Sequence, residues 1–340
     1  MKTADFSYDL PSELIAQSPS ERRDHSRMMV INRATGELLH RKFYDLPCFL
    51  RAGDCLVLNN SRVIPARLLG HRIHGGVAEI LLLGDLGGDR WDCLVKPGKN
   101  LKVGARVFFG GGKLTGEIER VGENGERVVR FTYDGMWNEL LNELGAMPLP
   151  HYIRAMPVDA ERYQTVYADP PGSAAAPTAG LHFTPELLDG LRKQGIRTAE
   201  VTLHVGLGTF LPVKAEEITS HRMHTERYEI GGEAATLINR TRQEGGRVVA
   251  VGTTSCRTLE SAAGKDGLVR EGGGETDIFI TPGYTFRAVD ALITNYHLPR
   301  STLLMLVSAF YSREGILAAY REAVRERYRF YSFGDAMLIL

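Results

Sequence analysis

Residues 247–257 read Arg-Val-Val-Ala-Val-Gly-Thr-Thr-Ser-Cys-Arg, so four consecutive apolar residues are followed by a glycine and three hydroxyl residues. This pattern predicts a buried strand over 247–252 that leads into a helix opened by Thr254 or Ser255. Backbone N–H groups at the start of such a helix favour negatively charged or oxygen-bearing ligand groups. A strand that passes directly into a helix is the repeating unit of α/β folds.

The neighbouring segments continue this alternation of strands and helices. Thr184-Pro185-Glu186 has the hydroxyl cap, first-position proline and early carboxylate that are typical of a helix start. The remaining predictions are a short helical start at 11–17, strands at 28–32, 54–59, 198–204 and 277–280, a helix at 234–242 and a closing helical segment at 303–327. The alternation indicates an α/β domain with a mixed or largely parallel sheet.

A block of different character interrupts this pattern. Six strand-like runs without helices between them lie at 64–73, 78–83, 91–95, 106–109, 114–121 and 127–133. Short strands spaced about 8–12 residues apart with glycine-rich turns predict a small antiparallel barrel or sandwich. We therefore predict a discontinuous α/β domain, residues 1–62 and 151–340, that carries an inserted antiparallel β-barrel domain, residues 63–150. The proline- and alanine-rich stretch 168–179 is predicted to be a long functional loop or a linker.

Composition excludes several classes of protein. The 340 residues carry 41 basic and 41 acidic side chains, so a generally basic surface that coats nucleic acid is excluded, although a local basic patch is not. The densest apolar stretch, 303–311, is about half of what a bilayer needs, and the first residues lack the apolar core of a signal peptide. Four cysteines without a C-x-x-C spacing argue against a zinc site and a disulfide framework. We expect a cytoplasmic protein without a membrane segment.

Common nucleotide-binding motifs do not match. Lys113 follows three glycines, but Val107 stands where a phosphate loop has its first glycine and Leu114 replaces the hydroxyl residue. After the predicted strand at 198–204, Leu211 occupies the third glycine position of a dinucleotide fingerprint.

Polar residues gather instead at the ends of the predicted strands. They lie in the segments 181–184, 202–210, 252–257, 281–284 and 295–299. Open α/β sheets hold their ligands at this edge, so the pattern predicts an enzyme with a polar small-molecule site. Plainer explanations stay open at this stage, since His204 is also typical of a core histidine and 221–227 of a solvated turn.

Nine segments together resemble one family. They are 5–19, 58–67, 148–153, 161–168, 179–184, 202–210, 252–257, 294–299 and 328–337. In these residues the chain resembles the S-adenosylmethionine:tRNA ribosyltransferase-isomerases of queuosine biosynthesis, with one departure at Ser312, where glycine is expected. The resemblance implies an α/β domain with an inserted barrel, a monomer, and no metal or other cofactor, because S-adenosylmethionine is consumed as a substrate.

The implied reaction transfers and isomerises the ribosyl group of S-adenosylmethionine. Its acceptor is 7-aminomethyl-7-deazaguanine at the tRNA wobble position, and the products are epoxyqueuosine in tRNA, adenine and methionine. Proton transfers near neutrality suit histidines and carboxylates, and the methionine carboxylate suits arginine. Two other functions stay open from the residues alone: a non-catalytic RNA-binding protein that uses the barrel, and an ordinary S-adenosylmethionine-dependent methyltransferase.

Candidate residues follow from these strand ends and from the implied chemistry. The catalytic candidates are His182, His204, Asp277 and His297. The candidates for binding S-adenosylmethionine are Gly206, Gly208, Thr209, Thr253, Thr254, Ser255, Arg257, Tyr284 and Asn295. The candidates for binding tRNA are Arg62, Arg67, His71, Arg72, Arg222 and Arg227. We expect the α/β domain and not the insert to hold S-adenosylmethionine, because the insert's loops lack converging polar groups.

Overall fold

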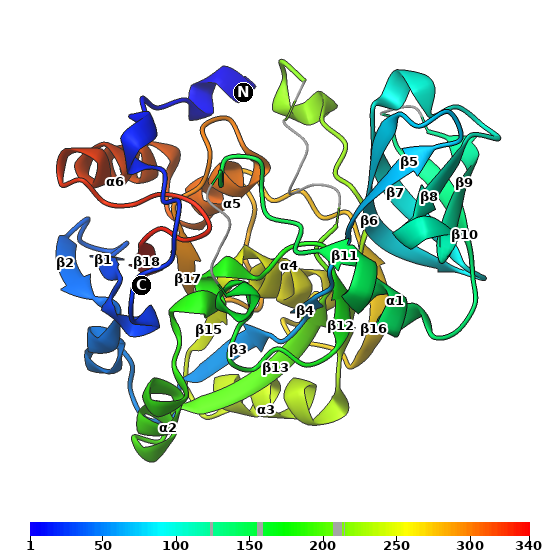
Figure 1. Cartoon of the computed structure of the whole chain (residues 1–340). Coiled ribbons are helices and arrows are strands. Elements are labelled where there is room, and N and C mark those ends of the chain that lie inside the picture. The colour runs from blue at the N-terminus through cyan, green and yellow to red at the C-terminus, as the bar shows by residue number, and fades with distance from the viewer. Residues whose placement is uncertain (123–124, 155–158, 207–212, 214) are drawn as a thin grey trace.

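The computed structural model describes residues 1–122, 125–154, 159–206, 213 and 215–340 of the chain. It combines a nine-stranded mixed sheet covered by helices with a separate, closed antiparallel barrel (Figure 1). The predicted fold class is confirmed.

The large sheet holds the predicted strand–helix unit at its centre. Its strands, in spatial order, are β16 (Gly272–Thr276), β14 (Glu226–Ile230), β13 (Arg197–Leu203), β3 (Cys55–Asn59), β15 (Val248–Val251), β17 (Ala291–Asn295), β18 (Ala336–Ile339), β1 (Arg27–Ile31) and β2 (Leu38–Lys42). The four central strands β13, β3, β15 and β17 run parallel to one another. Their carboxyl ends therefore share one edge, called here the carboxyl edge.

Alternating side chains of the central strands build a core on each face of the sheet. In β3, Cys55 and Val57 belong to one core and Leu56 and Leu58 to the other. The first core also contains side chains of α3 (Gly232–Gln243), α4 (Gly252–Ala262), α5 (Thr302–Phe310) and α6 (Arg313–Arg325). The second contains the three leucines on one face of α2 (Pro185–Lys193). Burial on both faces explains the uninterrupted apolar run of β15.

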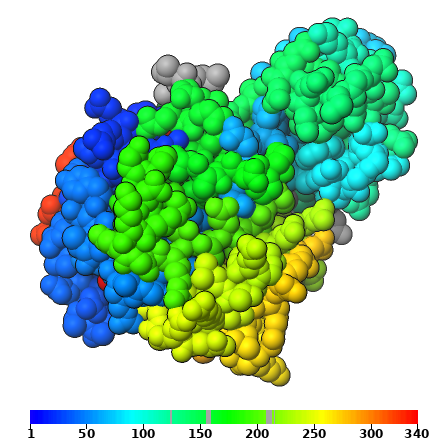
Figure 2. Space-filling model, turned by 90° about the horizontal axis from the view of Figure 1, so that it is seen from below, coloured from blue at the N-terminus to red at the C-terminus, as the bar shows by residue number. Residues whose placement is uncertain are grey.

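The barrel is formed by the six predicted strands. They are β5 (Arg67–Arg72), β6 (Val77–Gly87), β7 (Arg90–Lys96), β8 (Arg106–Phe109), β9 (Leu114–Val121) and β10 (Arg127–Tyr133). Pairing of β5 with both β6 and β8 closes the barrel. The short strand β11 (Gly145–Ala146) pairs with β5 and follows helix α1 (Trp137–Leu144). Figure 2 shows the barrel, in cyan and blue-green, projecting from the α/β body.

The stretch 168–179 joins the two parts and differs from the predicted loop or linker. Its strand β12 (Pro171–Ser173) pairs with β4 (Arg62–Val63), and a 3-10 helix, η8 (Thr178–His182), follows it. Ser173, Ala174 and Ala175 are buried because their small side chains allow neighbouring chain segments to approach closely. This segment is therefore part of the core beneath the barrel.

Three predicted elements are wrong. No strand forms at 277–280, because the Thr276 hydroxyl accepts the Ile278 N–H (3.2 Å) and the chain leaves the sheet after β16. The closing segment is two helices, α5 and α6, because the side chain of Ser312 caps the second by accepting the Gly315 N–H (3.0 Å). The helical start at 11–17 is only a 3-10 turn at Ser12–Leu14, which follows Pro11.

Among the described residues, no single helix is long and apolar enough to cross a membrane.

Candidate functional site

The carboxyl edge brings the ends of β13, β15 and β17 together, as the strand-end pattern predicts. Helix α4 follows β15 without a loop, beginning at Gly252 (φ +90°) rather than at Thr254 or Ser255. Ser255 donates its hydroxyl to the Val251 carbonyl (2.9 Å), so it is occupied within the helix. Thr253 is buried in the same turn. Thr254 Oγ1 is also buried, and it has no hydrogen-bond partner among the described residues. The Thr254 hydroxyl therefore remains able to meet a ligand.

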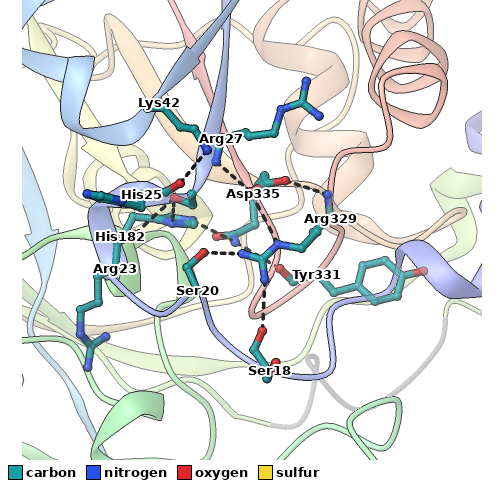
Figure 3. A network of polar contacts seen from close by, with 12 residues as sticks. Ser18, Ser20, Arg23, His25, Arg27, Lys42, His182, Arg329, Tyr331 and Asp335 are labelled. Atoms are coloured by element: carbon teal, nitrogen blue, oxygen red, sulfur yellow. Dashed lines mark hydrogen bonds and ion pairs between the residues drawn. The ribbon is translucent and has the colours of Figure 1, made fainter.

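His182 lies in a buried polar network at the end of β17. Its Nδ1 is 2.7 Å from Ser26 Oγ, its Nε2 is 3.3 Å from Asn295 Nδ2, and its ring stacks on Phe43 at 5.0 Å. Asn295 Nδ2 also donates to the Tyr331 carbonyl (3.1 Å). Figure 3 shows His182 and Tyr331 within this network, with hydrogen bonds and ion pairs as dashed lines.

The partners of His182 define its tautomer. Because Asn295 Nδ2 is a donor, His182 Nε2 accepts, and Nδ1 carries the proton and donates to Ser26. Burial, reinforced by Arg329 and Arg23, lowers the pKa of His182 to about 3. His182 is therefore neutral, with both ring nitrogens engaged, and is poorly suited to take a proton from a substrate.

The lowered pKa of His182 predicts a pH-dependent stability. The contribution of His182 to the free energy of unfolding is fully present above the ordinary pKa of about 6.5. It is lost as the pH falls towards 3, because the unfolded chain binds a proton on this histidine at a higher pH than the folded chain does. The advantage of wild type over a His182→Asn variant should shrink by about 1.4 kcal/mol per pH unit below pH 6. Urea unfolding at several pH values measures this difference. Parallel pH profiles for the two proteins would contradict it.

The same network ties the two ends of the chain together. Arg329 donates its side chain to Ser20 Oγ (2.5 Å) and its backbone N–H to Asp335 Oδ2 (2.8 Å), as Figure 3 shows. The other oxygen of Asp335 accepts the N–H of Arg27 at the start of β1 (2.8 Å). These bonds hold the segment that carries Ser26 against His182.

A second group of candidates surrounds a cavity of about 1060 Å³ between the α/β sheet and the barrel. The sheet contributes residues at the end of β13 and along β14 and β16, and the barrel contributes residues of β6, β7 and α1. Residues that line the cavity include Asp85, Trp91, Asp92, Trp137, Gly172, His204, Gly206, Glu226, Arg227, Glu229 and Glu275. The barrel thus forms one wall of this cavity, in contrast to the expectation that the insert offers no converging polar groups.

Arg257 and Glu226 form a buried ion pair behind the cavity wall. Their side chains are only 7% and 5% exposed, and Arg257 Nη1 donates to Glu226 Oε2. The other oxygen, Glu226 Oε1, accepts the Gly206 N–H (3.0 Å). Arg257 Nε and Nη2 have no partner among the described residues. Unpaired buried donors are rare in folded proteins, so these two nitrogens indicate a place for an anionic ligand group.

His204 is the candidate histidine that lines the cavity. Its backbone N–H donates to the Arg227 carbonyl (3.0 Å), and its Nδ1 is buried without a partner among the described residues. Burial, with Arg227 nearby, lowers the pKa of His204, so the ring is neutral at pH 7. A Cβ on Gly172 (φ +145°) would lie 2.9 Å from the ring, so only glycine leaves room for the imidazole there.

Known proteins match the sequence of this chain along its whole length. The family model described as "Queuosine biosynthesis protein" matches residues 3–339. This chain belongs to that family. Proteins named S-adenosylmethionine:tRNA ribosyltransferase-isomerase from Clostridioides difficile and Symbiobacterium thermophilum are 57% and 60% identical to it, over all of both chains. A crystal structure of S-adenosylmethionine tRNA ribosyltransferase from Thermotoga maritima covers 99% of the chain, and all of its own, at 43% identity with a TM-score of 0.58.

The remaining small-molecule candidates of this queuosine biosynthesis protein lie elsewhere. Tyr284 donates to Glu260 (2.9 Å) near the far end of α4 and is not brought to the carboxyl edge. His297 is bonded through Nε2 to Thr294 Oγ1 (2.8 Å), and burial lowers its pKa to about 3. Asp277 is exposed just after β16. Gly208 and Thr209 lie outside the described residues.

The basic candidates do not form one uniform patch. Arg62 is paired with Glu161 (2.5 Å), and Arg67 donates to the Leu149 carbonyl (3.0 Å) at the domain junction. His71 is exposed and Arg72 half-buried at the other end of β5. Arg222 and Arg227 are exposed, and Arg227 lines the cavity. Neither has an ion pair with a described residue, so both are free to contact a phosphate.

Glu226 is the functional candidate that sequence reasoning missed. It lies in the segment 221–227, whose charges are also typical of a solvated turn. Glu226 begins β14, in which the apolar Tyr228 and Ile230 alternate with charged residues, and this alternation is the local signal that Glu226 faces inward. No cluster of three or more His, Cys, Asp or Glu side chains suited to a metal ion occurs among the described residues.

Proposed function

We propose that this protein transfers and isomerises the ribosyl group of S-adenosylmethionine onto 7-aminomethyl-7-deazaguanine at the wobble position of tRNA. The products are epoxyqueuosine in tRNA, adenine and methionine. Relatives that bear the name of this activity match the chain from end to end. The structural observation that supports it best is the cavity beside the carboxyl edge, with His204 in its wall and the unpaired nitrogens of Arg257 behind it.

The chemistry assigns a role to His204. The positive sulfur of S-adenosylmethionine acidifies the adjacent ribose carbon, and a base must take a proton there. His204 is neutral at pH 7 because its pKa is lowered, so it is always available as an acceptor. After adenine leaves, the ammonium group of the acceptor base gives up a proton, the resulting neutral amine attacks the ribose, and an epoxide closes as methionine departs.

Arg257 is suited to the methionine end of the substrate. A guanidinium donates in a planar fork that matches a carboxylate, and two of its nitrogens are unpaired here. Glu226 accepts a hydrogen bond from the remaining nitrogen, Nη1, and thereby fixes the orientation of the guanidinium. The site therefore offers a negatively charged group a preformed, water-poor partner.

Product analysis tests this function. Purified protein, S-adenosylmethionine and a tRNA that carries 7-aminomethyl-7-deazaguanine should yield adenine and methionine in equal amounts. Formation of S-adenosylhomocysteine would instead identify a methyltransferase, and binding of the tRNA without turnover would identify a non-catalytic RNA-binding protein.

We also propose that the reaction needs no metal or further cofactor and that the protein acts as a cytoplasmic monomer. The proton transfers are within reach of side chains alone, and S-adenosylmethionine supplies the leaving group. Turnover should therefore be unchanged within twofold, or about 0.4 kcal/mol, after dialysis against a chelator. A loss restored by one divalent metal would contradict this. Light scattering of the purified protein tests the monomer.

Binding of tRNA should depend steeply on salt despite the zero net charge, because contacts to phosphates release counterions. Replacement of Arg222 by Gln should reduce the slope of log affinity against log salt concentration by about 1, the expected loss of one phosphate contact. Arg192, which is paired with Asp189 on α2, provides the matched control. A nearly flat salt dependence of the wild-type protein would contradict a basic contact surface.

A further inference from the structure

The barrel wall of the cavity has its own chemistry. Strands β6 and β7 contribute Asp85, Trp91 and Asp92, and helix α1 contributes Trp137 and Asn138. The two tryptophan rings stack at 5.6 Å with 28° between their planes. Trp137 Nε1 is buried and has no hydrogen-bond partner among the described residues. The wall therefore combines aromatic surface, an unused donor and carboxylates.

The charges around the cavity are unbalanced. Five carboxylates line it, Asp85, Asp92, Glu226, Glu229 and Glu275, and Arg227 is the one basic chain among the described lining residues. Glu226 is neutralised by Arg257. No ion pair within 4 Å joins Asp85, Asp92, Glu229 or Glu275 to a described residue, and Arg227 stands opposite Glu275 in the β14–β16 register. The cavity thus carries an excess of negative charge that a cationic ligand would offset.

Asp92 is the cavity carboxylate whose pKa is raised. It is half-buried, and its burial raises its pKa, although Arg120 on the barrel acts in the opposite direction. A half-buried carboxylate without an ion pair gains most from a cation brought by a ligand. The same cavity is lined by the stacked rings of Trp91 and Trp137, and aromatic surface attracts cations.

We propose that the barrel wall binds the flipped-out 7-aminomethyl-7-deazaguanine base of tRNA, with Asp92 and Asp85 facing its aminomethyl ammonium group and Trp137 facing the ring. This inference rests on the proposed function. A base inside an anticodon can be reached only when it is extruded from its stack, and a pocket between two domains accepts such a base. The ammonium group distinguishes the modified base from guanine, which carries no charge at that position.

S-adenosylmethionine also carries a positive charge, but its other groups fit the opposite wall. The amides at the start of α4 and the unpaired nitrogens of Arg257 belong to the α/β domain. With the ribosyl donor on that wall and the acceptor base on the barrel wall, His204 at the end of β13 lies between them. The barrel is then a substrate-specificity domain.

Three tRNA probes test this assignment. Their wobble position carries 7-aminomethyl-7-deazaguanine, the uncharged 7-cyano-7-deazaguanine, or guanine. Wild-type protein should bind the first more tightly than the other two. In an Asp92→Asn variant the ratio of these affinities should fall about tenfold, because one charge-assisted contact to the aminomethyl group is lost. Affinity for the guanine-containing tRNA and for S-adenosylmethionine should not change.

Companion variants sharpen the result. Asp85→Asn should act in the same direction, and Trp137→Phe should weaken binding of both deazaguanine tRNAs because the ring contact and the indole N–H are altered. Asp134→Asn, an exposed barrel position outside the cavity lining, is the matched control and should change nothing. Unchanged discrimination in the Asp92 variant, or a loss of affinity for S-adenosylmethionine in its place, would overturn the proposal. Failure of wild-type protein to turn over the modified tRNA would instead disprove the proposed function.

Discussion

An Arg257→Ala variant is expected to lose detectable binding of S-adenosylmethionine and to unfold more easily than wild type. The two effects have one cause. Arg257 and Glu226 are both buried, and removal of the arginine leaves a carboxylate in the interior without its counter-charge. Breaking such a pair costs about 3–5 kcal/mol of folding free energy. Urea unfolding and calorimetric titration with S-adenosylmethionine measure the two losses separately.

A double variant separates stability from binding. In Arg257→Ala combined with Glu226→Gln no buried charge remains, so most of the lost stability should return. Binding of S-adenosylmethionine should not return, because the guanidinium fork is still absent. Arg240→Ala, an exposed position paired with Glu244 on α3, is the matched control. Binding of S-adenosylmethionine by the folded double variant with wild-type affinity would contradict the role of Arg257.

Local patterns were sufficient to predict the elements that carry the site. The apolar run at 248–251 became β15 because a strand buried on both faces needs no alternation. The regular spacing of short runs from 64 to 133 became the barrel, because hairpin strands pair with their neighbours in sequence. In both cases the information lies within a few residues of the element that it predicts.

The site itself depends on contacts between distant segments, which local patterns do not contain. Glu226 is buried because Arg257, 31 positions later, neutralises it. His182 resembles a catalytic histidine in sequence, yet Ser26 and Asn295, 156 and 113 positions away, occupy both of its nitrogens. Asp92 and Trp137 line the same cavity as His204 only because the barrel lies against β14, and the sequence does not contain that arrangement.

A His204→Ala variant is expected to lower turnover by about 10²–10⁴-fold, the usual contribution of a general base, with little loss of stability. His204 lines the cavity and is neutral at pH 7, and its Nδ1 has no partner among the described residues that truncation would leave unsatisfied. Release of adenine in a single turnover, measured beside thermal unfolding, tests both parts. The wild-type rate should stay level as the pH falls through the ordinary histidine pKa of about 6.5 and decline only at lower pH, because burial lowers the pKa of His204 and only a protonated imidazole cannot accept a proton.

A His182→Ala variant provides the contrast, because the same substitution there should act through the fold. It removes the bonds to Ser26 and Asn295 and the stack on Phe43, so it should cost roughly 1–3 kcal/mol of stability. Its turnover per folded molecule should exceed that of the His204 variant by at least about tenfold, or 1.4 kcal/mol of barrier. Near wild-type turnover by the His204 variant would exclude it as the base. A folded His182 variant that is equally inactive would show that the buried network, and not the cavity wall, handles the proton.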